Sequence, residues 1–138
     1  MACEEQRLER KKSWRKFMYG YNTVMCLSFG PPMIIMQKLG RKILDWPYED
    51  PVMMGTYGSI VTSVGILSAS ALMDESKQDR YLPLFETQIM YKIMTCALIA
   101  NKMRKNEVSS WGIHFLFWFF VVYIVLLLGA TPWKPLED

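Results

Sequence analysis

The chain has 138 residues, of which 51% are hydrophobic, and its formal net charge is +3. The charged residues gather in the first 16 residues and in three short connections, and long uncharged runs lie between them. This distribution argues against an ordinary soluble bundle, whose helices carry charges every few residues, and against nucleic-acid binding, because basic residues beside apolar runs usually set membrane orientation.

Residues 1–16 form a basic segment that we expect on the cytoplasmic side of a membrane. Its six cations directly precede the first apolar run: Arg7, Arg10, Lys11, Lys12, Arg15 and Lys16. Glu4 and Glu9 each stand three residues before a cation, which favours a short surface helix. Basic residues next to a membrane span are retained in the cytoplasm, so this segment predicts a cytoplasmic N-terminus.

The first apolar run, residues 17–36, is long enough to cross a bilayer but contains Pro31 and Pro32. Proline removes a backbone donor and clashes with the preceding turn, so a span here would be kinked or broken near its far end. The alternative is a re-entrant or interfacial segment, which a membrane allows only where protein covers the freed backbone groups. Residues 37–50 mix basic and apolar side chains and predict an amphipathic stretch on the membrane surface.

Residues 51–73 predict a second span, because they contain 23 residues without a charge. A helix of about 20 apolar residues crosses the hydrocarbon core. Within this run Gly55, Ser59 and Ser63 are four residues apart and share one face, a pattern that allows close helix approach in lipid. We expect this face to pack against another helix of the same molecule, and a homodimer interface is the alternative.

Two further spans are predicted over residues 82–100 and 111–130, after a charged turn at residues 74–80. The last span is nearly all aromatic and aliphatic, and residues 131–138 form a short C-terminal tail. The third span differs from the others because it carries charged and amide side chains: Glu86, Gln88 and Lys92.

The number of spans follows from two opposing arguments. Four spans place nine lysines and arginines on the side of the termini and six on the other, whereas three spans give twelve against three. The positive-inside rule favours three, and the length of the first run favours four. We predict an all-α polytopic membrane protein, a four-helix transmembrane bundle over residues 17–130 with a distorted first helix. Three spans plus a re-entrant or interfacial first segment are the alternative.

Lys92 is the residue most informative about function, because it lies near the middle of its predicted span. A charged lysine near the bilayer centre costs roughly 2.5–3.5 kcal/mol, so it should face the bundle interior or a partner. Matching the depths of antiparallel helices places Lys92 near Ser63 of the second span and near Cys26 or Ser28 of the first. The same matching places Glu86 near Asn22. We therefore predict an intramembrane polar cluster, which either holds a substrate, proton or lipid headgroup or fixes helix packing: Asn22, Ser63, Glu86, Gln88 and Lys92.

The chain shows no set of residues typical of a catalytic centre. We find no nucleophile–base set, glycine-rich phosphate loop or cluster of metal-ligating residues in the sequence. The sequence therefore favours a protein that is not an enzyme, predicts no catalytic or metal-binding residue, and leaves any cofactor open.

The order of the elements and the stretch RYLPLFETQIMYK, residues 80–92, resemble small four-helix membrane proteins of the DoxX-like type. The resemblance covers the architecture of the whole chain, and residues 80–92 in detail. It implies a four-helix transmembrane fold. Some DoxX-like proteins are linked to quinone-dependent redox chemistry, but no residue here carries that activity over.

Three functions are compatible with this sequence. The first is a non-enzymatic accessory or assembly partner that acts through helix–helix contacts, and we prefer it because of the small-residue face and the missing catalytic set. The second is a carrier or channel-like protein for a small solute, lipid or proton, which uses Glu86 and Lys92. The third is a membrane redox subunit. The expected partners are the lipid bilayer and either another membrane protein or a second copy of the chain.

Overall fold

The structure, a computed structural model, describes residues 1–43, 45–47, 50–107 and 110–131, and within these residues it is helical without any strand. The all-α class is therefore confirmed. The helices, in chain order, are α1 (Ala2–Ile35), α2 (Gln37–Ile43), α3 (Pro51–Met73), the short 3₁₀ helix η1 (Glu75–Lys77), α4 (Pro83–Arg104) and α5 (Trp111–Ala130).

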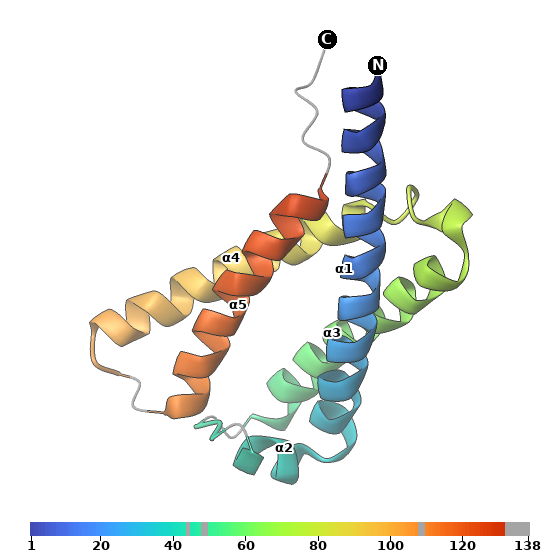
Figure 1. Cartoon of the computed structure of the whole chain (residues 1–138). Coiled ribbons are helices and arrows are strands. Elements are labelled where there is room, and N and C mark those ends of the chain that lie inside the picture. The colour runs from blue at the N-terminus through green and yellow to red at the C-terminus, as the bar shows by residue number, and fades with distance from the viewer. Residues whose placement is uncertain (44, 48–49, 108–109, 132–138) are drawn as a thin grey trace.

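The four long helices run alternately in opposite directions (Figure 1). α1 packs mainly along α3, and α4 packs mainly along α5. The start of α1 and the end of α5 lie at the same end of the molecule as the turn between α3 and α4, and α2 lies at the opposite end (Figure 1). α1 and α5 approach each other near the first of these ends and separate toward α2 (Figure 1).

α1 continues as a helix through Pro31 and Pro32 and ends at Ile35. The N–H of Met36 still donates to Pro32 O at 2.9 Å, and α2 begins at the next residue. The interruption expected near the far end of the first run therefore falls after the prolines, at Met36.

Glycines allow α1 and α3 to approach closely. A Cβ atom added to Gly58 would lie 2.8 Å from Met33 Cβ and 3.0 Å from Gly30 O, and one added to Gly65 would lie 2.8 Å from Leu27. Real Cβ atoms do not come this close to their neighbours, so the contact between the two helices depends on the missing side chains. The intramolecular packing face of α3 thus runs through Gly58 and Gly65.

The small-residue line expected from the sequence lies on another side of α3. Ser59 and Ser63 are exposed and Gly55 is half-buried. Each serine hydroxyl donates at 2.8 Å to a carbonyl one turn earlier on its own helix, Ser59 to Gly55 O and Ser63 to Ser59 O. This line is therefore not used for the contact with α1.

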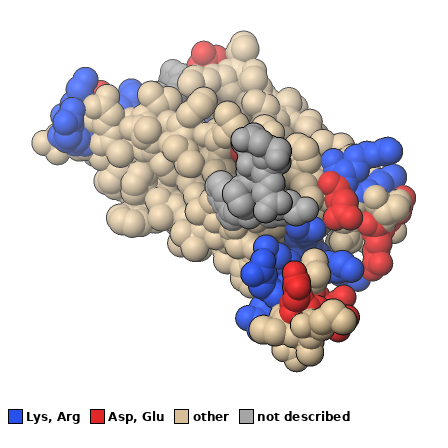
Figure 2. All heavy atoms as spheres, turned by 90° about the horizontal axis from the view of Figure 1, so that it is seen from above, with Lys and Arg blue, Asp and Glu red and all other residues tan. Residues whose placement is uncertain are grey.

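Two of the described helices, α3 and α5, are long and apolar enough to cross a membrane by length and composition. α1 and α4 do not meet the same combined criterion. The charged side chains gather toward the ends of the molecule, and Figure 2 shows a broad uncharged surface between them. A four-helix transmembrane bundle is thus not confirmed as such, whereas two candidate spans are.

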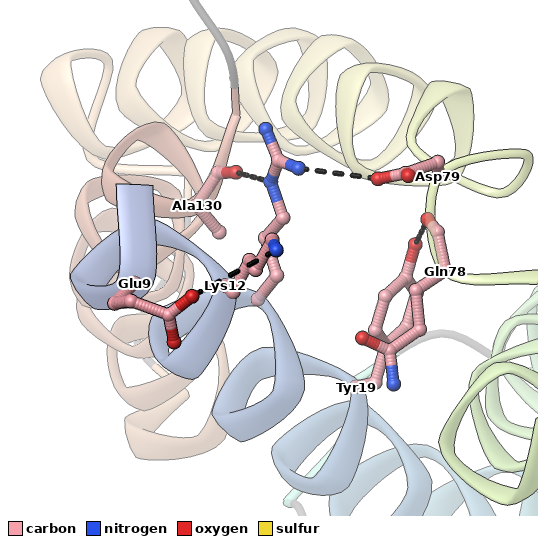
Figure 3. Close-up of polar contacts among 7 residues, drawn as sticks. Glu9, Lys12, Tyr19, Gln78, Asp79 and Ala130 are labelled. Atoms are coloured by element: carbon pink, nitrogen blue, oxygen red, sulfur yellow. Dashed lines mark hydrogen bonds and ion pairs between the residues drawn. The ribbon is translucent and has the colours of Figure 1, made fainter. Parts of the chain in front are cut away.

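Arg15 fastens three elements together at the end where α1 begins. Its Nε donates to Ala130 O at the end of α5, and its Nη1 donates to Asp79 Oδ1 after η1, both at 3.3 Å. Nearby, Tyr19 OH donates to Gln78 O at 2.6 Å (Figure 3). At the other end of the bundle, Ser110 Oγ donates to the carbonyl of Asp45, which ties the start of α5 to the connector before α3.

Candidate functional site

Lys92 is held inside the bundle by the inward face of α4. Phe85, Gln88 and Ile89 are buried on the same helix at spacings of three and four residues from it or from one another, so they share this face. The Lys92 side chain is 2% exposed. Lysine is rarely buried to this degree, because its ammonium group loses water and needs other contacts in compensation.

Aromatic rings supply those contacts. Lys92 Nζ donates a hydrogen bond to Tyr91 OH at 2.7 Å. It also lies 4.2 Å from the ring centroid of Tyr123, 4.3 Å from that of Tyr91 and 5.3 Å from that of Phe120. Ring faces within about 6 Å attract an ammonium group, most strongly where water is excluded. Among the described residues no carboxylate forms an ion pair with Lys92, so the rings and one phenol are its contacts.

A cavity of about 70 Å³ adjoins this lysine. Its walls come from α1, α3, α4 and α5, and Trp46 of the connector between α2 and α3 contributes to them. Apart from Lys92, Cys26 and the tyrosine hydroxyls, the side chains around it are apolar, among them Phe29, Met33, Val61 and Phe115. The arrangement is an apolar chamber with one amine in its wall.

A layer of polar side chains lies one helical turn from the lysine, toward the end where α1 begins. The core at that end includes residues of all four long helices, among them Tyr19, Ala71, Phe85 and Leu127. Because neighbouring helices are antiparallel, a step of one turn toward the middle of each helix reaches a common level. The residues at this level are all buried: Asn22, Ser68, Gln88 and Tyr123.

Only part of this layer is satisfied by hydrogen bonds within the described residues. Tyr123 OH donates to Asn22 Oδ1, and Cys26 Sγ lies 3.9 Å from the same hydroxyl. Asn22 Nδ2, Ser68 Oγ and both amide atoms of Gln88 are buried without a partner in this part of the chain. An unpaired buried polar group costs about 1–3 kcal/mol. The bundle interior therefore contains buried donors and acceptors that form no hydrogen bond among the described residues.

The structure brings some members of the predicted cluster together and leaves others apart. Asn22, Gln88 and Lys92 face the interior, whereas Glu86 and Ser63 are exposed on α4 and α3. Successive residues of an α-helix are about 100° apart around its axis, so positions close in sequence can face inward and outward. Sequence spacing does not show which side of each helix faces the interior. Whether the cluster acts on a ligand stays a prediction.

The aromatic side of the site was not predicted from the sequence, whereas Cys26, which was expected near Lys92, lines the same cavity. Tyr91, Phe120 and Tyr123 surround the amine. The signal was the spacing of Phe120, Tyr123 and Leu127, which recur every three or four residues and form the buried stripe of α5. In an almost wholly aromatic and aliphatic helix that stripe does not stand out from the residues that surround it.

The chemistry of the site can only be inferred from its own geometry, because a fold does not by itself define a function. The likeness of residues 80–92 to DoxX-like proteins stays a prediction from the sequence. Comparison of the chain with protein-family models, curated proteins and solved structures gave no match.

Proposed function

We propose that this chain is a four-helix integral membrane protein that binds a small solute or lipid beside Lys92, as a carrier or lipid-binding protein. The observation that carries the proposal is the buried amine of Lys92 at an apolar cavity, without a carboxylate partner among the described residues. A methionine of similar length would fill the same space without the cost of burying an amine. The amine therefore points to a contact with an acceptor group that a purely structural residue would not need.

The surfaces of α1 and α4 support their crossing a membrane together with α3 and α5. α4 has 22 residues and is about 33 Å long, compared with about 30 Å for the hydrocarbon core. Its outward side chains between the charged ends are large and apolar: Met90, Ile93, Met94 and Leu98. On α1 the exposed large side chains of this stretch are also apolar: Val24, Leu27, Phe29 and Ile34. Such a surface suits acyl chains, and the basic first segment favours a cytoplasmic N-terminus.

Labelling of single cysteines tests this topology. In a cysteine-free background, Leu39→Cys reports on the connector before α3 and Ser76→Cys reports on the turn after it; both positions are exposed. A membrane-impermeant thiol reagent should label Leu39→Cys from outside intact cells and Ser76→Cys only after the cells are opened. With the N-terminus in the cytoplasm, the opposite result would mean that α1 does not cross, and the four-helix topology would be removed from the proposal.

Access to the cavity tests the binding function without any assumption about the ligand. Cys26 lines the cavity, so a variant with Cys3→Ser and Cys96→Ser carries one thiol at the proposed site. The apolar reagent N-ethylmaleimide should label Cys26 in the folded, membrane-embedded protein. The control is Ala71→Cys in a cysteine-free background, because Ala71 is fully buried in the core and does not line the cavity. Equal resistance of the two thiols would mean that the cavity admits no molecule, and the binding function would fail.

An accessory role is a second candidate function, supported by the exposure of Ser59 and Ser63 in line with the half-buried Gly55. The contact of α3 with α1 uses other glycines, so this line remains open to a second copy of the chain. Oxidative cross-linking in the membrane should join two copies through Ser59→Cys more readily than through Ile60→Cys, which is exposed on a different side of α3. Equal cross-linking at both positions would count against a specific interface.

A further inference from the structure

We infer that the ligand of the Lys92 cavity is a single-chain lipid with a carboxylate head, a long-chain fatty acid, which reaches the lysine sideways between α1 and α5. The inference rests on the proposed function, because it names the class of molecule that the cavity binds. It follows from the size of the cavity, the position of its rim and the hydrogen-bonding groups at its polar end.

The size of the cavity suits a small head group. The volume open to the centre of a water molecule is about 70 Å³, and about 10–15 Å³ of such volume is enough to hold one water. A long-chain lipid is larger than this space, so it would place its head in the cavity and leave part of its chain outside.

The rim of the cavity lies on the outer surface between α1 and α5. Phe29 of α1 is 40% exposed and Phe115 of α5 is 50% exposed, yet both line the cavity. α1 and α5 also separate toward the end where Phe29 and Phe115 stand (Figure 1). An acyl chain that leaves the cavity at this point meets phenyl rings on both sides, and then the apolar surface that the proposed topology places in lipid.

The polar end of the cavity matches an anion. Lys92 Nζ offers N–H donors, and an anion beside it would favour the charged ammonium form. Tyr91 OH accepts a hydrogen bond from Lys92 Nζ at 2.7 Å, so its own proton remains available for donation to a ligand. Two donors, one of them charged, recognise a carboxylate through short charge-assisted hydrogen bonds. An ester lacks the charge, and an amine would repel the lysine.

Protection of Cys26 from N-ethylmaleimide tests the inference in the full chain carrying Cys3→Ser and Cys96→Ser. Palmitate should slow the labelling of Cys26, and methyl palmitate at the same concentration should not. Lys92→Met should weaken palmitate binding about tenfold or more, because a hydrogen bond to a charged group is worth more than the 1.4 kcal/mol that corresponds to a factor of ten. Lys105→Met, at the exposed end of α4, should leave protection unchanged.

The possible outcomes separate this inference from the proposed function. Labelling of Cys26 without protection by palmitate would overturn the fatty acid as ligand and leave a binding cavity in place. Equal protection by methyl palmitate, or full protection in a folded Lys92→Met variant, would overturn recognition of the carboxylate. A Cys26 that resists the reagent altogether would overturn both proposals. If Lys92→Met does not fold, Tyr91→Phe takes its place: weaker protection by palmitate supports the inference, and unchanged protection contradicts it.

Discussion

The hydrogen bond between Tyr123 and Asn22 joins α5 to α1 at the centre of the molecule. Both side chains are buried, and Asn22 Nδ2 has no partner among the described residues. Removal of the tyrosine hydroxyl leaves Asn22 Oδ1 without a donor as well. The energetic weight of this contact comes from the cost of an unpaired buried amide rather than from the net strength of the bond.

Tyr123→Phe should therefore lower the free energy of unfolding by about 1–3 kcal/mol. The double variant Asn22→Leu/Tyr123→Phe should be more stable than this single variant, because both polar partners are then replaced by apolar groups. Thermal unfolding of the purified proteins in detergent measures both effects. If the double variant loses as much stability as Asn22→Leu and Tyr123→Phe lose together, the two residues do not act as a unit.

Asp74 predicts a pH dependence at the turn between α3 and η1. Hydrogen bonds from the Ser76 hydroxyl and the Ser76 N–H, together with the charge of Lys77, lower the pKa of this carboxyl below its ordinary value of 3.8. A carboxyl with a lowered pKa in the folded state stabilises that state at neutral pH, and this contribution disappears as the pH falls through the lowered pKa. The stability difference between the protein and Asp74→Ala should thus be constant near neutral pH and shrink below pH 3.8. A difference that stays constant into that acidic range would show that the charge has no part in it.

At the scale of the helices, the contact of α1 with α3 depends on glycines whose positions the sequence did not single out. A valine at position 58 would place its Cβ 2.8 Å from Met33 Cβ and 3.0 Å from a backbone carbonyl. A valine at position 59 would point away from α1, because Ser59 is exposed. Valine substitutions at these two neighbouring positions can therefore be compared directly, with position 59 as the control.

Gly58→Val should lower the free energy of unfolding by about 1–3 kcal/mol, which is typical of an overpacked interior. Ser59→Val should change it by no more than about 0.5 kcal/mol, as expected for a surface substitution. Thermal unfolding in detergent compares the two variants directly. Similar losses in both would mean that α3 faces α1 with a different side.

Particular helices show what the sequence could and could not predict. α3 and α5 begin and end where the uncharged runs do, because Asp50 accepts hydrogen bonds from the N–H groups of the first turn of α3 and charged or polar segments flank both helices. α1 is longer than its apolar run, because the basic segment continues the same helix. The burial of Lys92 follows from the cost of a charge in an apolar setting. The outward position of Glu86 and the aromatic rings around Lys92 depend on how each helix is rotated, which only the packed structure gives.

The whole molecule is fastened more firmly at one end than along its length. Trp14 Nε1 donates to Leu126 O at 3.0 Å, and Arg15 Nε donates to Ala130 O at 3.3 Å, so α1 holds the last turns of α5 through two side chains. A cation near the C-terminal end of a helix also interacts favourably with the carbonyl groups exposed there. α1 and α5 are thus in contact at the end where α1 begins and are farther apart near the cavity (Figure 1).

The two contacts of Arg15 should differ in their effect on stability. Its side chain is largely buried, whereas that of Asp79 is 87% exposed, and exposed ion pairs are weakened by water and salt. Arg15→Met should lower the free energy of unfolding by about 1–2 kcal/mol, and Asp79→Asn by about 0.5 kcal/mol or less. Thermal unfolding at low and high salt distinguishes the two variants. Equal effects would assign the stabilisation to the ion pair rather than to the carbonyl of Ala130.

The serine hydroxyls on the outer side of α3 change how this helix partitions between water and lipid. Ser59 and Ser63 contribute two polar groups by composition, but each hydroxyl is already bonded to a carbonyl of its own helix. A hydroxyl with its donor satisfied loses less on leaving water than a free one. α3 should therefore enter a bilayer more readily than its number of serines suggests, more like an alanine-rich segment. A hydropathy sum over single residues underestimates its affinity for lipid.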